Sequence, residues 1–246
     1  LYAAQAGVPD LGEPLRLRLP KGSLESVSRA RLLDGANLLA IGDGGADNWE
    51  LLQFGRAELV EPGIWEISER LRGQAGSDAI MPEVWPAGSM VVLMNGAPAQ
   101  IDLALGARGL ARHYRVGSAV LGYDDASYVH RVEAFDGIGL RPYAPCHLRV
   151  QMDGGDAVAR WIRRTRIDGD SWAGSEVPLG EAFEAYLVRV VEGSVIRRED
   201  IIELPEWVYP ATAQAEDGIA GPYEIHVAQL SDAFGAGPFA RIQIHG

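Results

Sequence analysis

The sequence predicts an all-β protein, and three observations lead to this prediction. The 246 residues include 30 glycines and 14 prolines, which break the chain about every ten residues. Between these breaks lie short runs that alternate apolar with polar side chains, as strands with one buried face do. Helical spacing of apolar residues is confined to two short, glycine-bounded stretches, around Leu24 to Ala30 and Leu103 to Leu110.

The N-terminal part of the chain contains the first of these strands. Leu15 to Leu19 alternates leucine with arginine, and Asn48 to Leu71 has the pattern of a β-meander that turns at Pro62-Gly63. Trp49 and Trp65 have the spacing of core-facing residues in this meander. We therefore predict that both tryptophans belong to a structural core.

A domain boundary is expected in the stretch RPYAPCHL, Arg141 to Leu148. Its two prolines stiffen the chain and remove donors that a strand ladder needs. The prediction is a β-rich domain over residues 1–146, followed by a second domain over residues 147–246. A length of about 100 residues is that of one immunoglobulin-like sandwich.

The second domain has the clearest strand pattern. In four runs every second residue is apolar, which predicts one buried face for each strand. These faces consist of Ala157, Ala159 and Trp161; Tyr186, Val188 and Val190; Tyr223, Ile225 and Val227; and Ala240, Ile242 and Ile244. The aromatic members Trp161, Tyr186 and Tyr223 are predicted to be structural core residues.

The charge of the chain argues against several classes of partner. The formal net charge is −12 and the sequence pI is about 4.9. Nucleic-acid-binding domains carry a basic surface, whereas the densest basic stretch here, Arg160 to Arg166, is interpreted as the solvated face of a strand. No apolar run approaches the ~18 residues of a membrane span. We expect neither nucleic-acid binding nor stable membrane insertion.

The start of the chain and its cysteine usage bear on where the protein is made. The sequence begins with Leu1 and not with Met, and it shows no basic segment followed by an apolar one, as a signal peptide has, so it is interpreted as a piece of a longer polypeptide. The single cysteine, Cys146, excludes an intrachain disulfide and is consistent with synthesis in a reducing cytoplasm.

Catalytic chemistry finds little support in the sequence. Cys146 lies beside His147, but adjacent side chains of an extended chain point to opposite sides, so we interpret Cys146 as a small filler. No nucleophile elbow and no phosphate-binding glycine loop occurs. The five histidines lack zinc-ligand spacing. We expect a protein that is not an enzyme and that uses neither cofactor nor metal.

Acidic residues leave two alternatives open. Asp43 to Asp47 (DGGAD) and Asp168 to Asp170 (DGD) are similar to parts of calcium-binding turns. Carboxylate pairs for sugar hydrolysis are conceivable at Asp124-Asp125 and at Glu181 and Glu184. Aspartate and glycine also form tight turns without metal, and such pairs arise by chance among 34 acidic residues, so turns and solvated faces are the favoured interpretations.

Tryptophans outside the clear strands raise a second function class. Trp85, Trp172 and Trp207 lie near proline or glycine, where an exposed ring can serve as a platform for a sugar or for a protein partner. Trp172 and Trp207 are therefore candidate contacts for a ligand or partner. The alternative function is a carbohydrate- or receptor-binding module.

Three long stretches of the sequence resemble one group of proteins. They are NWELLQFGRAELVEPGIWEISERLRG at Asn48 to Gly73, GLRPYAPCHLRV at Gly139 to Val150, and WIRRTRIDGDSWAGSEVPLGE at Trp161 to Glu181. The first is similar to a domain of the tail-tip and host-specificity proteins of tailed phages, and the second resembles the hinge that follows that domain. The last looks like the opening of the fibronectin type III-like domain that ends the gene transfer agent baseplate protein called megatron.

The resemblance implies a fold for the second domain. Fibronectin-like sandwiches place a buried tryptophan on the second strand and a tyrosine near the start of the sixth, and Trp161 and Tyr223 follow in that order. The second domain is thus expected to be a seven-stranded fibronectin type III-like sandwich.

The resemblance also implies a structural role in the tail tip or baseplate of a phage-like particle. The partners expected from it are other tail-tip and hub proteins, with three copies of the chain around the tail axis. A glycan or protein of the recipient cell surface is a further expected partner, since the family takes part in attachment and envelope penetration. The expected location is the particle tail, after synthesis in the bacterial cytoplasm and release by lysis.

Overall fold

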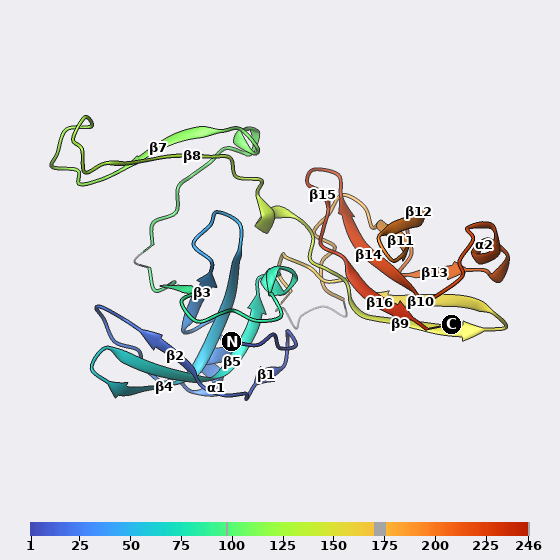
Figure 1. Ribbon diagram of the computed structural model, residues 1–246, viewed down its shortest axis with the longest axis horizontal. Coiled ribbons are helices and arrows are strands. Elements are labelled where there is room, and N and C mark those ends of the chain that lie inside the picture. Colours follow the sequence, from blue (N-terminus) through green and yellow to red (C-terminus); the bar gives the residue numbers. More distant parts are fainter. Residues whose placement is uncertain (97, 170–175, 246) are drawn as a thin grey trace. The chain divides into compact units, whose positions relative to one another are not determined.

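The computed structural model describes residues 1–96, 98–169 and 176–245, and strands dominate it (Figure 1). The α-helices in this described part are the short α1 (Arg29–Leu33) and α2 (Ala211–Glu216). Neither is long and apolar enough to cross a membrane. The predicted all-β class is confirmed.

The chain divides into two units, Leu1–Gly139 and Leu140–Gly246. The division lies just before the proline-rich stretch that was expected to contain it. The expected boundary after residue 146 would separate the first residue of strand β9 (Cys146–Asp153) from the rest of that strand.

The first unit contains an antiparallel sheet in the order β1-β5-β4-β3-β6, with β2 also paired to β5. Its long central hairpin turns at Pro62-Gly63 as predicted, and Gly63 has the positive φ of 72° that this turn requires. The strands are β1 (Pro9–Asp10), β2 (Leu15–Arg18), β3 (Leu38–Gly42), β4 (Trp49–Glu61), β5 (Ile64–Gln74) and β6 (Met90–Leu93).

Strand β4 has the opposite phase to the one the sequence suggested. Glu50, Leu52 and Phe54 face the core, whereas Trp49 is half-buried, and its indole N–H donates to the carbonyl of Gly45 at 2.7 Å. Trp49 is therefore not a member of the core. The charge of Glu50 made it look like a solvent-facing residue, but a buried arginine pairs with it.

The core of the first unit lies against this sheet and contains a different tryptophan. Trp85 is buried there, contrary to the expectation of an exposed ring, and Trp65 packs at the margin of the core, half-buried. The other buried members are Leu17, Leu19, Leu24, Leu39, Ile41, Leu52, Phe54 and Ile67.

The two stretches with helical spacing are largely not helical. Leu24 lies outside any helix, and α1 begins only after Ser28, whose hydroxyl accepts from the N–H of Arg31 at 3.4 Å. Around Leu103 to Leu110 the structure has only a single 3-10 turn, and Gly109 adopts a φ of 70° that ends it. The first unit also includes a two-stranded hairpin, β7 (Arg112–Val116) and β8 (Val129–Glu133).

The second unit is a sandwich of two antiparallel sheets. One sheet has the order β13-β10-β9, and the other has the order β12-β11-β14, with β16 and the short β15 (Gly235–Ala236) also paired to β14. The remaining strands are β10 (Asp156–Ile162), β11 (Tyr186–Glu192), β12 (Val195–Ile202), β13 (Glu206–Tyr209), β14 (Tyr223–Ser231) and β16 (Ala240–Ile244).

The strand order identifies the type of sandwich. Apart from the two-residue β15, the first, second and fifth strands described in this unit share one sheet, and the third, fourth, sixth and seventh share the other. This is the arrangement of a fibronectin type III domain, so the predicted fold is confirmed. Trp161 lies on the second strand and Tyr223 begins the sixth.

Aromatic side chains fill the core between the two sheets. Trp161 meets Tyr186 edge to face at 5.2 Å between ring centroids, and Tyr209 meets Tyr223 in the same way at 5.9 Å. Trp161, Tyr186 and Tyr223 are all buried. Burial, with a hydrogen bond to a carboxylate, raises the pKa of Tyr186 and of Tyr209 above the ordinary tyrosine range.

Candidate interaction sites

Trp207 is a buried core residue of the sandwich. Its side chain is 8% exposed, its ring stacks on Tyr209 at 5.3 Å, and its N–H donates to Asp200 at 3.1 Å. Strand β13 alternates exposed and buried residues, which directs Trp207 and Tyr209 inward. The expectation of an exposed platform at Trp207 is wrong, and Trp172 lies outside the described residues.

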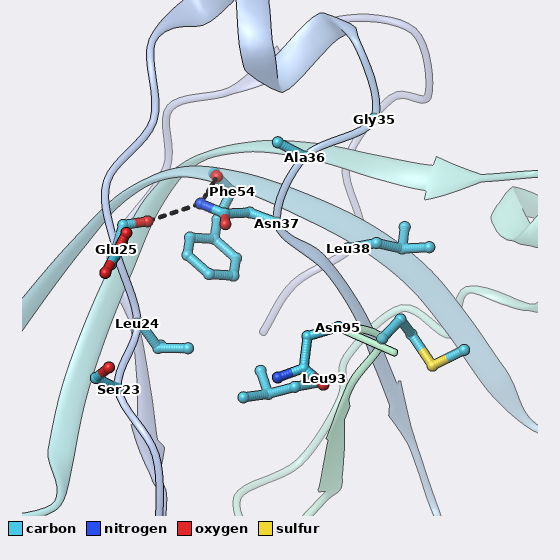
Figure 2. Close-up of a pocket in the computed structure, with 11 residues that line it drawn as sticks. Ser23, Leu24, Glu25, Gly35, Ala36, Asn37, Leu38, Phe54, Leu93 and Asn95 are labelled. Carbon is cyan, nitrogen blue, oxygen red and sulfur yellow. Dashed lines mark hydrogen bonds between the residues drawn. The ribbon is translucent and has the colours of Figure 1, made fainter. Parts of the chain in front are cut away.

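The first unit has an open hollow of about 410 Å³ beside α1 (Figure 2). Its apolar lining comes from Leu24, Leu38, Phe54 and Leu93, and polar groups of Ser23, Glu25, Asn37 and Asn95 surround them. The amide of Asn37 donates both N–H groups, to the carbonyls of Glu25 (2.8 Å) and Phe54 (3.0 Å).

The chemistry that this hollow offers is limited by its lining. Glu25 is the only ionisable residue among the described residues that line it, so an acid–base pair is not formed there. The hydrogen bonds of Asn37 hold the segment around Glu25 against the sheet and thereby shape the hollow. It is suited to an apolar group with a few polar neighbours.

The DGGAD stretch forms a tight turn between β3 and β4. The carboxylate of Asp43 accepts from the N–H of Gly45 at 2.7 Å and from the side-chain amide of Asn48 at 2.8 Å. These donors, Asn48 first, lower the pKa of Asp43. The carboxylate thus has a conformational role here. Asp170 of the second acidic stretch is not among the described residues.

The paired carboxylates are held by separate donors. Asp125 accepts from the N–H and the hydroxyl of Ser127 at 2.9 and 2.7 Å, which forms a local turn. Glu181 pairs with Arg166 at 3.0 Å, and Glu184 accepts from the hydroxyl of Tyr186 at 2.6 Å. These contacts assign the carboxylates to turns and to loop anchoring.

A basic hollow lies on the outer face of the three-stranded sheet of the sandwich. It has a volume of about 360 Å³ and is lined by His147, Arg149, Arg160, Trp161 and Ile162. His147 adopts a φ of 53°, and the β9–β10 ladder shifts register between Arg160 and Ile162, so the strands bulge here.

The cross-strand register of this hollow places two arginines opposite one another. Arg149 pairs with Arg160 in the β9–β10 ladder, and like charges in such positions destabilise a sheet. Arg160 donates to Glu206 at 2.5 Å, which leaves the charge of Arg149 as an excess. Ile162 beside them is 57% exposed. The arrangement can bind an anionic group next to an apolar surface.

The sequence did not reveal this hollow. Arg149 and Arg160 are eleven positions apart, and each on its own has the pattern of a solvated strand residue. Cys146, next to the hollow, is half-buried and pairs with Ile162 in the ladder. Among the residues that the structure describes, no group of three His, Cys, Asp or Glu side chains is placed to hold a metal ion.

These features define the class of the protein: an all-β chain in which a sheet of six strands precedes a fibronectin type III-like sandwich. The family model described as "Rcc01698-like, C-terminal" matches residues 1–92, which end within β6. No curated protein matches the chain. Among solved structures, the rat CD45 extracellular region, domains d3–d4, aligns at 11% identity and a TM-score of 0.33, covering 67% of this chain and 79% of that one.

Proposed function

We propose that this protein is a structural component of the tail tip or baseplate of a phage-like particle of the gene transfer agent type. There it contributes to attachment to the recipient cell and to passage through the envelope. The observation that carries the proposal is the family match over residues 1–92, which spans the sheet from β1 into β6. Separately, the motifs at Gly139 to Val150 and Trp161 to Glu181 resemble parts of tail-tip proteins.

The physical character of the chain is consistent with this role. The β4–β5 hairpin pairs over most of its length, and the two-sheet sandwich encloses an aromatic core. The carboxylates described above make structural contacts. The hollows are suited to binding. In the proposed assembly three copies surround the tail axis, beside hub and other tail-tip proteins.

Locating the protein in purified particles tests this proposal. An epitope tag would be inserted at the exposed Gly193-Ser194 turn of the full-length protein in the bacterium that encodes it. We expect antibody-bound gold at one end of the particle tail in electron micrographs. Purified particles without any label, or with label on the head, would contradict a place in the tail tip.

A second candidate function is recognition of an acidic saccharide, and the basic hollow favours it. An acidic sugar has an anionic group, a carboxylate or a phosphate, that Arg149 can bind. It also has an apolar ring face that Ile162 can contact. This function is compatible with the first, because a tail-tip protein can bind the recipient surface.

Replacing Arg149 by serine is expected to weaken binding of acidic glycans about tenfold or more, because a charge-assisted hydrogen bond is lost. A glycan array followed by titration at two salt concentrations measures the effect. The matched control is Arg241→Ser, an exposed arginine on β16 in the other sheet, which should leave binding unchanged. Equal binding of neutral and acidic glycans, or full binding by Arg149→Ser, would exclude this site.

A further inference from the structure

Two histidines face one another across the β7–β8 hairpin. Nδ1 of His113 lies 2.9 Å from Nε2 of His130, and both side chains are exposed. The ring planes are within 6° of parallel and the centroids are 5.1 Å apart. That separation is about the nitrogen–nitrogen distance plus the radius of each ring, so the rings meet edge to edge through one shared hydrogen.

The distance between the two nitrogens matches a bidentate metal site. Two imidazole nitrogens that bind one ion at ~2.0–2.1 Å and at a right angle to each other lie about 2.9 Å apart. The rings need only tilt until their lone pairs converge on one point, and exposed side chains can rotate at little cost. The ring that now donates the shared hydrogen must carry it on its other nitrogen, a change of tautomer that releases no proton.

The surroundings of the pair allow an ion to enter. In the ladder, His113 is opposite Val132 and His130 is opposite Arg115. Of these two ladder partners, Arg115 carries a positive charge. Its guanidinium lies over the ring of Tyr128, 5.9 Å from the centroid. Within the described residues no third ligand of the His, Cys, Asp or Glu type joins the pair.

A metal ion bound by both histidines would stabilise the β7–β8 hairpin. A two-stranded sheet is at best marginally stable in water, and β7 pairs with β8 in a sheet of its own. An ion held by one side chain from each strand links β7 to β8 and stabilises the hairpin by mass action.

We propose that His113 and His130 bind one divalent ion of a late first-row transition metal, and that this ion fixes β7 against β8. A right angle between the two nitrogens suits the tetragonal geometry of Cu²⁺ and Ni²⁺, and affinity should follow Cu²⁺ above Ni²⁺ and Zn²⁺. Mg²⁺ and Ca²⁺ prefer oxygen ligands and should not bind. The remaining coordination positions belong to water. This inference does not depend on the proposed function.

The test uses the whole chain at neutral pH. Calorimetric titration with Ni²⁺ should give one site, and the electron paramagnetic resonance spectrum of added Cu²⁺ should show coordination by imidazole nitrogen. Hydrogen exchange of the amides of residues 112–133 should slow when Zn²⁺ is added. His113→Asn and His130→Asn should each weaken Ni²⁺ binding at least about tenfold, because one imidazole then remains.

The control variant is His245→Asn, which removes an exposed histidine from the second unit and should leave Ni²⁺ binding and the exchange effect intact. Mg²⁺ is the control ion. If both hairpin variants bind Ni²⁺ as the unaltered chain does, or if Zn²⁺ leaves hairpin exchange unchanged, the proposal is overturned. Circular dichroism of each variant establishes that a loss of binding does not reflect unfolding.

Discussion

Replacement of Trp161 by alanine should lower the free energy of unfolding of the sandwich by about 3–5 kcal/mol. The side chain is 4% exposed and packs edge to face on Tyr186 in the core between the two sheets. Its removal leaves a cavity that the surrounding aromatic rings cannot close without losing their own contacts. Urea denaturation followed by circular dichroism measures the change.

The neighbouring residue provides the control for this prediction. Ile162 is 57% exposed on the same strand, so Ile162→Ala should change the unfolding free energy by only about 0.5 kcal/mol. Hydrogen exchange resolved by peptide should assign the loss in Trp161→Ala to residues 140–246. A cost for Trp161→Ala no larger than that for Ile162→Ala would show that Trp161 does not organise this core.

Replacement of Arg72 by alanine should destabilise the first unit by about 3–5 kcal/mol, because it leaves a buried carboxylate without its partner. Arg72 binds both carboxylate oxygens of Glu50, at 2.6 and 2.7 Å, and neither side chain is exposed. The indole N–H of Trp85 donates to the same carboxylate at 2.7 Å. Urea denaturation and hydrogen exchange of residues 1–96 measure the effect.

A surface arginine of the same hairpin is the matched control for Arg72. Arg56 on β4 pairs with Glu69 at 2.6 Å, but its side chain is 72% exposed. Solvent screens such a pair, so Arg56→Ala should cost about 0–1 kcal/mol. Similar costs for the two variants would contradict the prediction, because the buried Arg72–Glu50 pair would then matter no more for stability than the exposed Arg56–Glu69 pair.

Strand alternation was most informative where both sheets contribute to one core. The runs that contain Trp161, Tyr186 and Tyr223 could be predicted because each strand of the sandwich buries one face, and the period of two then appears directly in the sequence. The turn at Pro62-Gly63 could be predicted for a similar local reason, since proline and glycine fix its backbone angles.

The alternation of apolar and polar residues did not predict burial correctly in two situations. In one the core contains charged residues, and in the other a buried ring lies in a short segment near proline. Glu50 and Arg72 are buried together, so their polarity reversed the apparent phase of β4 and made Trp49 look like a core residue. Trp85 and Trp207 lie in short segments near proline, which looked like loops, yet both are buried. A charged residue can be buried in a folded protein only when a partner of opposite charge lies beside it. The sequence alone does not show which residue that partner is.

The sequence by itself determined the all-β class and the aromatic core of the sandwich, because both follow from local periodicity along single strands. Only the tertiary structure decided which distant residues become neighbours. Arg149 meets Arg160, and His113 meets His130, through cross-strand register. Register depends on turns, on a bulge and on burial of whole strand faces, so the two binding sites inferred from these pairs could not be seen in the order of the residues.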